Sequence, residues 1–237
     1  MPHARARAHI GRGAAGVSAS PRLRVIVTAA SSELGEALLR ALTARARLRF
    51  AGHAAVPVER ILAVDRVQRP ELFVDERIDY VRGDYEQPRF LARMMGAATF
   101  SVFHLSAIEA AAGVEPGGAG LEIALARSFG ATHSLLDACR GLPRPPRLVF
   151  AGRRGVREAG ATVPRDTAAM CADICESVLV EAARRGLIEL RCVRLPPAPA
   201  ALETCAAGLI EAHEIEGVKG PFLILESEDD GRLRPVN

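Results

Sequence analysis

The segment Leu23–Gly35, LRVIVTAASSELG, decides the fold of this chain. Its first six residues are an apolar run of the kind that forms a buried strand. A short polar turn follows at Ala29–Leu34, and Gly35–Ala46 then places its apolar residues at helical spacing. A strand, a turn and a helix in this order predict the opening unit of a parallel α/β sheet.

The same alternation continues along the chain. Further apolar runs predict strands at residues 60–65, 78–82, 99–105, 147–151, 190–195 and 221–226. Helices are predicted at residues 90–95, 121–140, 166–185 and 202–213. Crossovers between parallel strands are right-handed, so the pattern predicts a doubly wound parallel Rossmann sheet of about seven strands. Ligands bind such sheets at the carboxyl ends of the strands.

The predicted Rossmann domain occupies residues 23–226. Residues 1–22 are rich in Arg, Ala and Gly, contain no acidic residue and lack the apolar centre of a secretory signal. We expect them to form a disordered N-terminal extension. Residues 227–237 are expected to form an acidic, flexible tail.

Composition limits the possible partners and compartments. A formal net charge of +3 is too small to indicate nucleic-acid binding, and no apolar run is long enough to indicate a membrane span. The five cysteines contain no C-x-x-C motif, which favours neither a disulfide framework nor a zinc site. Cys171 and Cys175 share a helix face, where they could bind a metal or, as we favour, pack in the core. We expect a cytoplasmic protein without a metal.

Six motifs in order resemble the extended short-chain dehydrogenase/reductases, the NAD-dependent epimerase/dehydratase family. They are the turn at 28–35, Asp65, Gly83-Asp84, the strand end FHLSA at 103–107, LLDACR at 135–140 and CESVLVEAARRG at 175–186. The last of these is most similar to the D-erythronate dehydrogenase-like branch. The resemblance covers roughly residues 23–196 together with the last helix and strand.

The resemblance implies an NAD site, but with an altered phosphate-binding turn. The implied positions are Thr28, Ala29, Ser32, Glu33, Leu34, Gly35, Asp65, Asp84, Leu105, Ser106 and Ala107. Of the three glycines in the family's turn, only Gly35 is present. Ala29 and Ser32 are expected to put side chains where the pyrophosphate approaches, and Glu33 adds negative charge at the helix N-terminus. Asp65 implies a preference for NAD over NADP, but we expect NAD binding to be weak or absent.

The resemblance places a catalytic hydroxyl, a tyrosine and a lysine where this chain has Arg153, Ala168 and Ala172. In the family the tyrosine is the general acid/base and the lysine lowers its pKa, so these replacements remove the proton relay. His104 is expected to be part of the scaffold, and the family's helix asparagine aligns with Ser128.

Composition supports the loss of the proton relay, because tyrosine and lysine are scarce throughout. The single lysine is Lys219, and neither Tyr80 nor Tyr85 is followed four residues later by a lysine. The substrate-binding lobe is also largely missing, since Pro196 leads almost directly to the last helix. His213, at the end of that helix, is expected to be cationic and to suit the helix dipole.

Arginines are expected to surround the former active site. Arg153, Arg154, Arg157 and Arg165 could bind a carboxylate or phosphate there, or could form a solvated basic loop.

These features favour a pseudoenzyme or another non-redox protein that binds a small molecule. The alternative is a cofactor-independent cyclase, isomerase or lyase acting on an anionic metabolite, and the second alternative is an atypical NAD-dependent oxidoreductase. By resemblance, the helices at 121–140 and 166–185 are expected to form a homodimer.

Overall fold

The computed structural model describes residues 23–50, 53–67, 74–87, 89–96, 99–110, 120–154, 167–196 and 201–236. The elements are β1 (Leu23–Thr28), α1 (Glu33–Ala44), β2 (Arg47–Phe50), β3 (His53–Asp65), β4 (Ile78–Arg82), α2 (Phe90–Met94), β5 (Thr99–His104), α3 (Ser106–Ala110), α4 (Leu121–Arg140), β6 (Arg147–Arg153), α5 (Thr167–Arg184), β7 (Glu189–Leu195), α6 (Leu202–Glu214), β8 (Phe222–Ser227) and β9 (Leu233–Pro235). Residues 1–22 lie outside the described residues.

The strands form one nine-stranded sheet in the order β2-β3-β1-β5-β6-β7-β8-β9, with β4 also paired to β3. Seven strands (β1, β3, β4, β5, β6, β7 and β8) pair in parallel. This confirms the predicted doubly wound Rossmann sheet. The strands that the sequence pattern missed, β2 and β9, pair antiparallel with β3 and β8.

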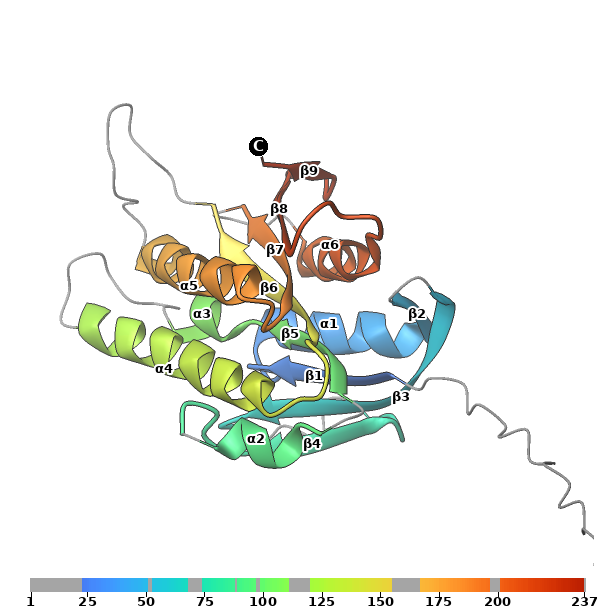
Figure 1. Cartoon of the computed structure of the whole chain (residues 1–237), viewed down its shortest axis with the longest axis horizontal. Helices are drawn as coiled ribbons and strands as arrows, with labels where there is room; N and C mark the ends of the chain where they lie inside the picture. The colour runs from blue at the N-terminus through green and yellow to red at the C-terminus, as the bar shows by residue number, and fades with distance from the viewer. Residues whose placement is uncertain are drawn as a thin grey trace, which may run out of the picture.

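Helices cover both faces of the sheet, with α1 and α6 on one face and α4 and α5 on the other (Figure 1). Strand β1 shows why both faces need cover. Val25 and Val27 pack in the core cluster that contains α1 and α6, whereas Ile26 packs in the cluster that contains α4 and α5. A strand that is apolar on both faces is typical of a parallel sheet covered by helices.

The segment at 227–237, expected to be a flexible tail, contains strand β9. Leu233 pairs with Ser227 and packs against the core beneath α6. The turn before β9 includes Gly231, whose φ of +84° is in the left-handed region that favours glycine. A strand of three residues is too short to show an alternating pattern.

The parallel strands bring distant residues together along the carboxyl edge of the sheet. Thr28 at the end of β1 lies beside His104 of β5, and His104 lies beside Phe150 of β6. Farther along this edge, Arg153 pairs with Leu195 of β7. None of the described helices is both long enough and apolar enough to cross a membrane.

Candidate functional site

The turn between β1 and α1 keeps a conformation that normally needs glycine. Ala29 has a φ of +53°, in the left-handed region, where an L side chain costs about 1–2 kcal/mol. Its methyl group is buried in the core on the α1 side. We expected this methyl to face an approaching phosphate, and the structure corrects that: the alanine strains the backbone and does not fill the surface of the site.

Gly35 allows the turn to pack closely on α1. A Cβ atom at this position would lie 2.5 Å from the carbonyl oxygen of Ala29 and 2.7 Å from that of Ala30. Both obstacles are backbone atoms, which cannot swing away as a flexible side chain can. The third glycine of the family's turn therefore has a packing role in this chain.

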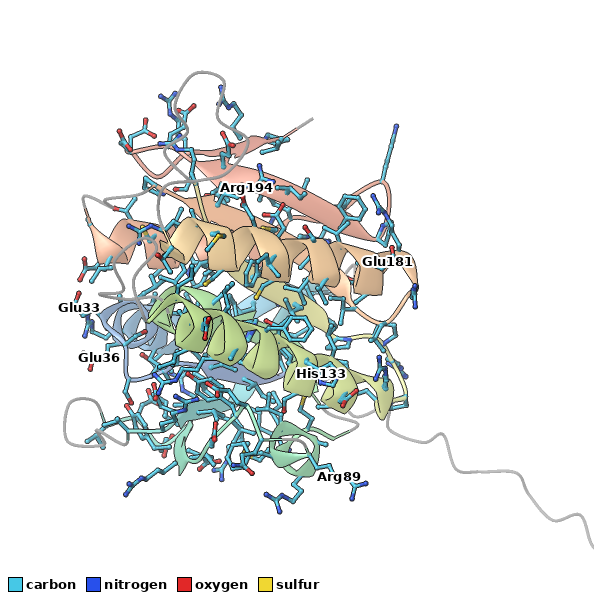
Figure 2. The ribbon with its side chains drawn as sticks, turned by 90° about the vertical axis from the view of Figure 1, so that its left-hand side faces the viewer. Glu33, Glu36, Arg89, His133, Glu181 and Arg194 are labelled. Carbon is cyan, nitrogen blue, oxygen red and sulfur yellow. The ribbon has the colours of Figure 1, made fainter. Side chains whose placement is uncertain are left out.

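Ser32 caps α1 with its own side chain. Its hydroxyl accepts a hydrogen bond from the Gly35 N–H at 3.1 Å and donates to the Ala29 carbonyl at 2.7 Å. The first N–H groups of a helix have no partner within the helix and are the groups that bind phosphate in dinucleotide sites. The chain thus satisfies one of these donors internally. Glu33 and Glu36 lie at the rim of the molecule (Figure 2), and Glu33 is exposed.

Asp65 ties the end of β3 to the turn. Its Oδ2 accepts the Ser31 N–H at 2.8 Å, while its Oδ1 accepts the N–H groups of Arg66 at 2.6 Å and Val67 at 3.3 Å. Both carboxylate oxygens therefore hold the local backbone. Each retains further acceptor capacity because a carboxylate oxygen has more than one lone pair.

Asp84 belongs to an ion cluster beside Asp65. It accepts the Glu86 N–H at 3.1 Å and pairs with Arg66, which also binds the Glu86 carboxylate. The Arg66 guanidinium lies over the Tyr85 ring, 5.7 Å from the ring centroid. Asp84 is thus largely engaged by protein groups.

His104 is a neutral part of the scaffold. Thr132 donates its proton to the Ser128 carbonyl, so its oxygen accepts from His104 Nε2 at 3.0 Å. His104 Nδ1 then accepts from the Thr28 hydroxyl at 3.0 Å, and that hydroxyl also accepts the Leu105 N–H. Burial lowers the pKa of His104 to about 3. Both ring nitrogens are satisfied, in agreement with the expected scaffold role.

The remaining positions of the implied cofactor site are interior. Leu105, Ser106 and Ala107 are buried where β5 leads into α3, and Leu34 is buried on α1. The Ser106 hydroxyl lies 3.2 Å from the His104 ring nitrogens. These residues fix the strand end rather than presenting side chains to solvent.

The positions expected to carry catalytic groups contribute no acid or base. Arg153 ends β6, while Ala168 and Ala172 lie on the buried face of α5. Ala168 packs in a small cluster with Ala124 and Cys171, and Ala172 packs in the core on the α4 and α5 side. Tyr80 lies on β4, Tyr85 follows that strand, and Lys219 lies between α6 and β8.

Of the predicted arginines, the structure places two at the carboxyl edge. The Arg154 N–H donates to the Leu195 carbonyl at 2.7 Å, and its guanidinium lies 3.9 Å from the exposed Asp229 carboxylate. Arg157 and Arg165 lie outside the described residues.

The sequence analysis missed an ion pair between the buried Glu176 of α5 and the half-buried Arg194 of β7. Arg194 donates to both carboxylate oxygens, at 3.0 Å and 2.6 Å, and the Cys192 thiol donates to Glu176 at 3.1 Å. The hydrogen bond to Glu176 raises the pKa of Arg194, and burial raises the pKa of Cys192 well above its ordinary value. Two features of the sequence could have predicted this pair: Glu176 falls on the apolar face of a predicted helix, and Arg194 falls inside a predicted strand.

A groove of about 330 Å³ lies between α4 and α5. Its lining is apolar and consists of Leu125, Ala126, Ser128, Phe129, Cys171, Ile174 and Cys175. Burial raises the pKa of Cys175 to about 11, so this thiol stays protonated. Within the described ranges, no three side chains of the types that bind metals come together.

Comparisons with known proteins agree with the resemblance seen in the sequence. No family model matches the chain. The D-erythronate dehydrogenase of Cupriavidus necator is 28% identical over 183 residues, which are 73% of this chain and 55% of that protein. This chain therefore spans about half the length of that curated relative.

Solved structures share the fold at low sequence identity. The nucleoside-diphosphate-sugar epimerase from Agrobacterium tumefaciens has a TM-score of 0.67 and 19% identity, covering 94% of this chain and 77% of the other. The UDP-glucuronic acid 4-epimerase from Bacillus cereus was solved in complex with UDP-glucuronic acid and NAD. It has a TM-score of 0.64 and 15% identity, and the match covers 86% of this chain and 76% of that chain. Together, the curated relative and the shared fold confirm that this chain resembles the NAD-dependent epimerase/dehydratase family, with D-erythronate dehydrogenase as its curated relative.

Proposed function

We propose that this chain is a pseudoenzyme that binds a small molecule at the carboxyl edge of its sheet and does not transfer hydride. The observation that carries the proposal is the pair of alanines where the family's tyrosine and lysine fall. Ala168 is 4% exposed and Ala172 is 1% exposed, so both positions are packed and offer no group that titrates. Reduction of a carbonyl needs a positioned proton donor, which these residues cannot supply.

The turn at residues 28–35 fits a dinucleotide only in part. Asp65 keeps acceptor capacity for a ribose, but the N–H of Gly35 already donates to Ser32. A pyrophosphate would have to displace that hydrogen bond, at a net cost of about 1 kcal/mol or about fivefold in affinity. Glu33 adds a like charge near the same helix end, although solvent screens it. These features support weak or absent NAD binding.

Calorimetric titration with NAD+ and NADH tests the nucleotide part of this proposal. The double variant Ala29→Gly with Ser32→Gly restores the family's glycines, removes the cap and relaxes the left-handed position, so we expect it to bind NAD+ at least about fivefold more tightly. The single variant Ser32→Ala also frees the Gly35 N–H but keeps a side chain, so comparison with it separates the effect of the hydrogen bond from the effect of the glycines. Micromolar binding by the unchanged protein would contradict weak binding.

Assay with NAD+ and D-erythronate tests the absence of hydride transfer. The curated relative is named for this substrate. We expect no formation of NADH by this chain. Steady production of NADH would instead support the second alternative, an atypical NAD-dependent oxidoreductase.

Arg153 and Arg154 favour a second candidate, a cofactor-independent cyclase, isomerase or lyase for an anionic metabolite. Both arginines follow the β6 core at the edge where ligands of such sheets bind. The ion pair of Arg154 with Asp229 is long and exposed, and pairs of this kind are worth about 1 kcal/mol or less. An anionic substrate could therefore replace Asp229, with positioning and electrostatics supplying the rate.

Thermal unfolding with inorganic phosphate or malonate as a probe tests this anion site, of which Arg157 would be a further member. We expect these anions to stabilise the protein and the effect to fall in Arg153→Met. The matched control is Arg185→Met, which removes an exposed arginine beyond the end of α5. Equal stabilisation of Arg153→Met and the unchanged protein would remove the second candidate.

We also infer that the protein forms a homodimer through α4 and α5 and works in the cytoplasm. Ile123, Phe129 and Ile174 are 55%, 45% and 41% exposed on these helices, beside the apolar groove. Exposed apolar surface of this kind marks interaction sites. All five cysteines are buried and free, which suits a reducing compartment.

A further inference from the structure

Helices α4 and α5 lie side by side on one face of the sheet (Figure 1), and both begin at its carboxyl edge. Their first turns are in contact, because Ala124 of α4 packs in one small cluster with Ala168 and Cys171 of α5. The first N–H groups of a helix give that end a partial positive charge. Two positive helix ends therefore meet at one place on this side of the molecule.

The apolar groove of about 330 Å³ lies next to these first turns, since its lining begins at Leu125 of α4 and Cys171 of α5. The residues of α5 that line it are Cys171, Ile174 and Cys175, whose spacing places them on one face of the helix. No described residue that lines the groove is charged, and burial raises the pKa of Cys175 to about 11, so that its thiol stays neutral. The groove therefore suits an uncharged apolar chain.

Thr167, the first residue of α5, extends this lining face by one turn towards the carboxyl edge. It precedes Cys171 by four residues, the spacing that brings two side chains onto the same face of a helix. Thr167 is 3% exposed, and its hydroxyl is buried without a hydrogen-bond partner among the described residues. Buried hydroxyls normally have a partner, because leaving one unpaired costs free energy. The Thr167 hydroxyl therefore marks a place for a polar atom at one end of the groove.

The helix end decides which kind of polar atom fits beside this hydroxyl. A hydroxyl can donate or accept, but the positive end of α5 favours an acceptor that carries negative charge. The first turn of α5 contains no acidic residue to supply that charge, and Glu122 in the first turn of α4 is exposed to solvent. No arginine or lysine of the described chain lines the groove, so a singly charged carboxylate fits better than a doubly charged phosphate.

We propose that the groove between α4 and α5 binds a small monocarboxylic acid with an apolar chain, such as a medium-chain fatty acid. The chain lies between Leu125, Phe129 and Ile174, which line the groove. The carboxylate accepts hydrogen bonds from the Thr167 hydroxyl and from N–H groups of the first turn of α5, as anions do at helix N-termini.

This site is separate from the one at the carboxyl ends of the strands. It uses neither the turn at residues 28–35 nor Arg153, so it does not rest on the proposed function, and either proposal can fail while the other stands. Phe129 and Ile174 also belong to the face of the inferred homodimer. Calorimetry reports binding of the acid and light scattering reports dimerisation, so the two properties are measured independently.

Calorimetric titration with octanoate, octanol and acetate tests the site, with octanoate kept below the concentration at which it forms micelles. Octanol has the chain without the charge, and acetate has the charge without the chain. We expect octanoate to bind about tenfold more tightly than octanol, and acetate to give no measurable heat. Equal affinities for octanoate and octanol, or no binding of octanoate to either monomer or dimer, would overturn the proposal.

The variant Thr167→Val removes the hydroxyl, keeps the shape of the side chain and breaks no hydrogen bond of that hydroxyl in the described chain. We expect it to weaken octanoate binding about fivefold and so to narrow the advantage of octanoate over octanol. Thr43→Val is the matched control, because it removes a threonine hydroxyl from α1. Equal octanoate affinities of Thr167→Val and the unchanged protein would overturn the proposal.

The variant Arg153→Met separates this site from the anion site considered at the carboxyl edge. We expect it to bind octanoate as tightly as the unchanged protein does. A loss of octanoate binding in Arg153→Met would assign the carboxylate to the carboxyl edge and would overturn the proposal.

Anomalous diffraction from crystals soaked in ω-bromo-octanoate locates the chain directly and needs no variant to fold. We expect a bromine peak between α4 and α5, beside Phe129 and Ile174. Bromine at other places only, or no bromine peak, would overturn the proposal.

Discussion

Ala29 shows that a backbone conformation favoured by glycine can be held with an alanine in place. The turn keeps a left-handed φ although an alanine occupies the position. The conformational cost of this φ is offset by the contacts of the turn. Strand β1 is fixed in the sheet, Gly35 packs against the turn, and the Ser32 hydroxyl donates to the Ala29 carbonyl. A conformation of this kind persists only where its surroundings determine it.

Comparison of Ala29→Gly with Ala30→Gly measures that strain. Both substitutions delete a buried methyl group and loosen the unfolded chain equally, but only Ala29 has a positive φ. We expect Ala29→Gly to be less destabilising than Ala30→Gly by about 1–2 kcal/mol in the free energy of unfolding. Urea denaturation of both variants measures the difference, and equal losses would show that the turn is unstrained.

The buried histidines predict a loss of stability in mild acid. His104 and His213 have pKa values of about 3 in the folded protein against 6.5 in the unfolded chain. Below pH 6.5 the unfolded state therefore binds more protons, and stability falls as pH falls towards 3, by about 1.4 kcal/mol per pH unit for each histidine. Above pH 6.5 this contribution is complete.

Denaturant unfolding between pH 7.5 and 5 measures this slope. We expect His213→Phe to reduce the slope by about the share of one histidine, 1.4 kcal/mol per pH unit. His133→Gln is the comparison variant, because His133 is exposed on α4. A slope that is the same in His213→Phe and the unchanged protein would contradict the assignment.

Between elements, the Glu176–Arg194 pair joins α5 to β7 close to Ala172. Glu176 lies one helical turn after Ala172 and is buried, and Arg194 also reaches Glu226 of β8 at 3.8 Å. The pair therefore links a helix with two neighbouring strands.

Breaking this pair should be costly. Glu176→Gln removes the nearer of the two carboxylates that pair with the half-buried Arg194 and leaves Glu226 at 3.8 Å, so we expect a loss of about 1–3 kcal/mol in the free energy of unfolding. The control is Glu181→Gln, whose partner Arg185 is exposed, with an expected loss below about 1 kcal/mol. A double-mutant cycle with Arg194→Met separates the pair energy, and a coupling near zero would refute it.

For the chain as a whole, the sequence predicted the doubly wound parallel sheet from seven apolar runs and the helical segments between them, whereas the order of the strands in the sheet comes from the structure. It missed β2 and β9, which have four and three residues. It predicted a strand at residues 60–65 where β3 begins at His53, because Pro57 and Glu59 interrupt the apolar pattern before residue 60. The expected site positions came from the family resemblance, whereas the direction of the Ala29 methyl and the charge state of His213 depend on contacts between distant segments. The expectation of a cationic His213 is wrong, because burial first, and then Arg147 and Arg191, lower its pKa to about 3.

The proposed homodimer predicts that charge on the exposed face of α4 and α5 separates two copies. Phe129→Asp and Ile174→Asp each place a carboxylate in the apolar face, so we expect a change from dimer to monomer in light scattering after gel filtration. Val74→Asp is the control, since Val74 is 89% exposed and lies outside these helices. A monomeric unchanged protein would rule out the dimer.

Strand β9 has a consequence for how the molecule avoids self-association. Without it, β8 (FLILES) would present a six-residue, mainly apolar edge whose free N–H and C=O groups invite strand addition. With it, the edge is a strand of three residues that carries the charge of Arg234 and ends at Pro235, which has no N–H to offer. A second copy approaching this side meets a much shorter template for extending the sheet, so we expect β9 to oppose fibrous aggregation.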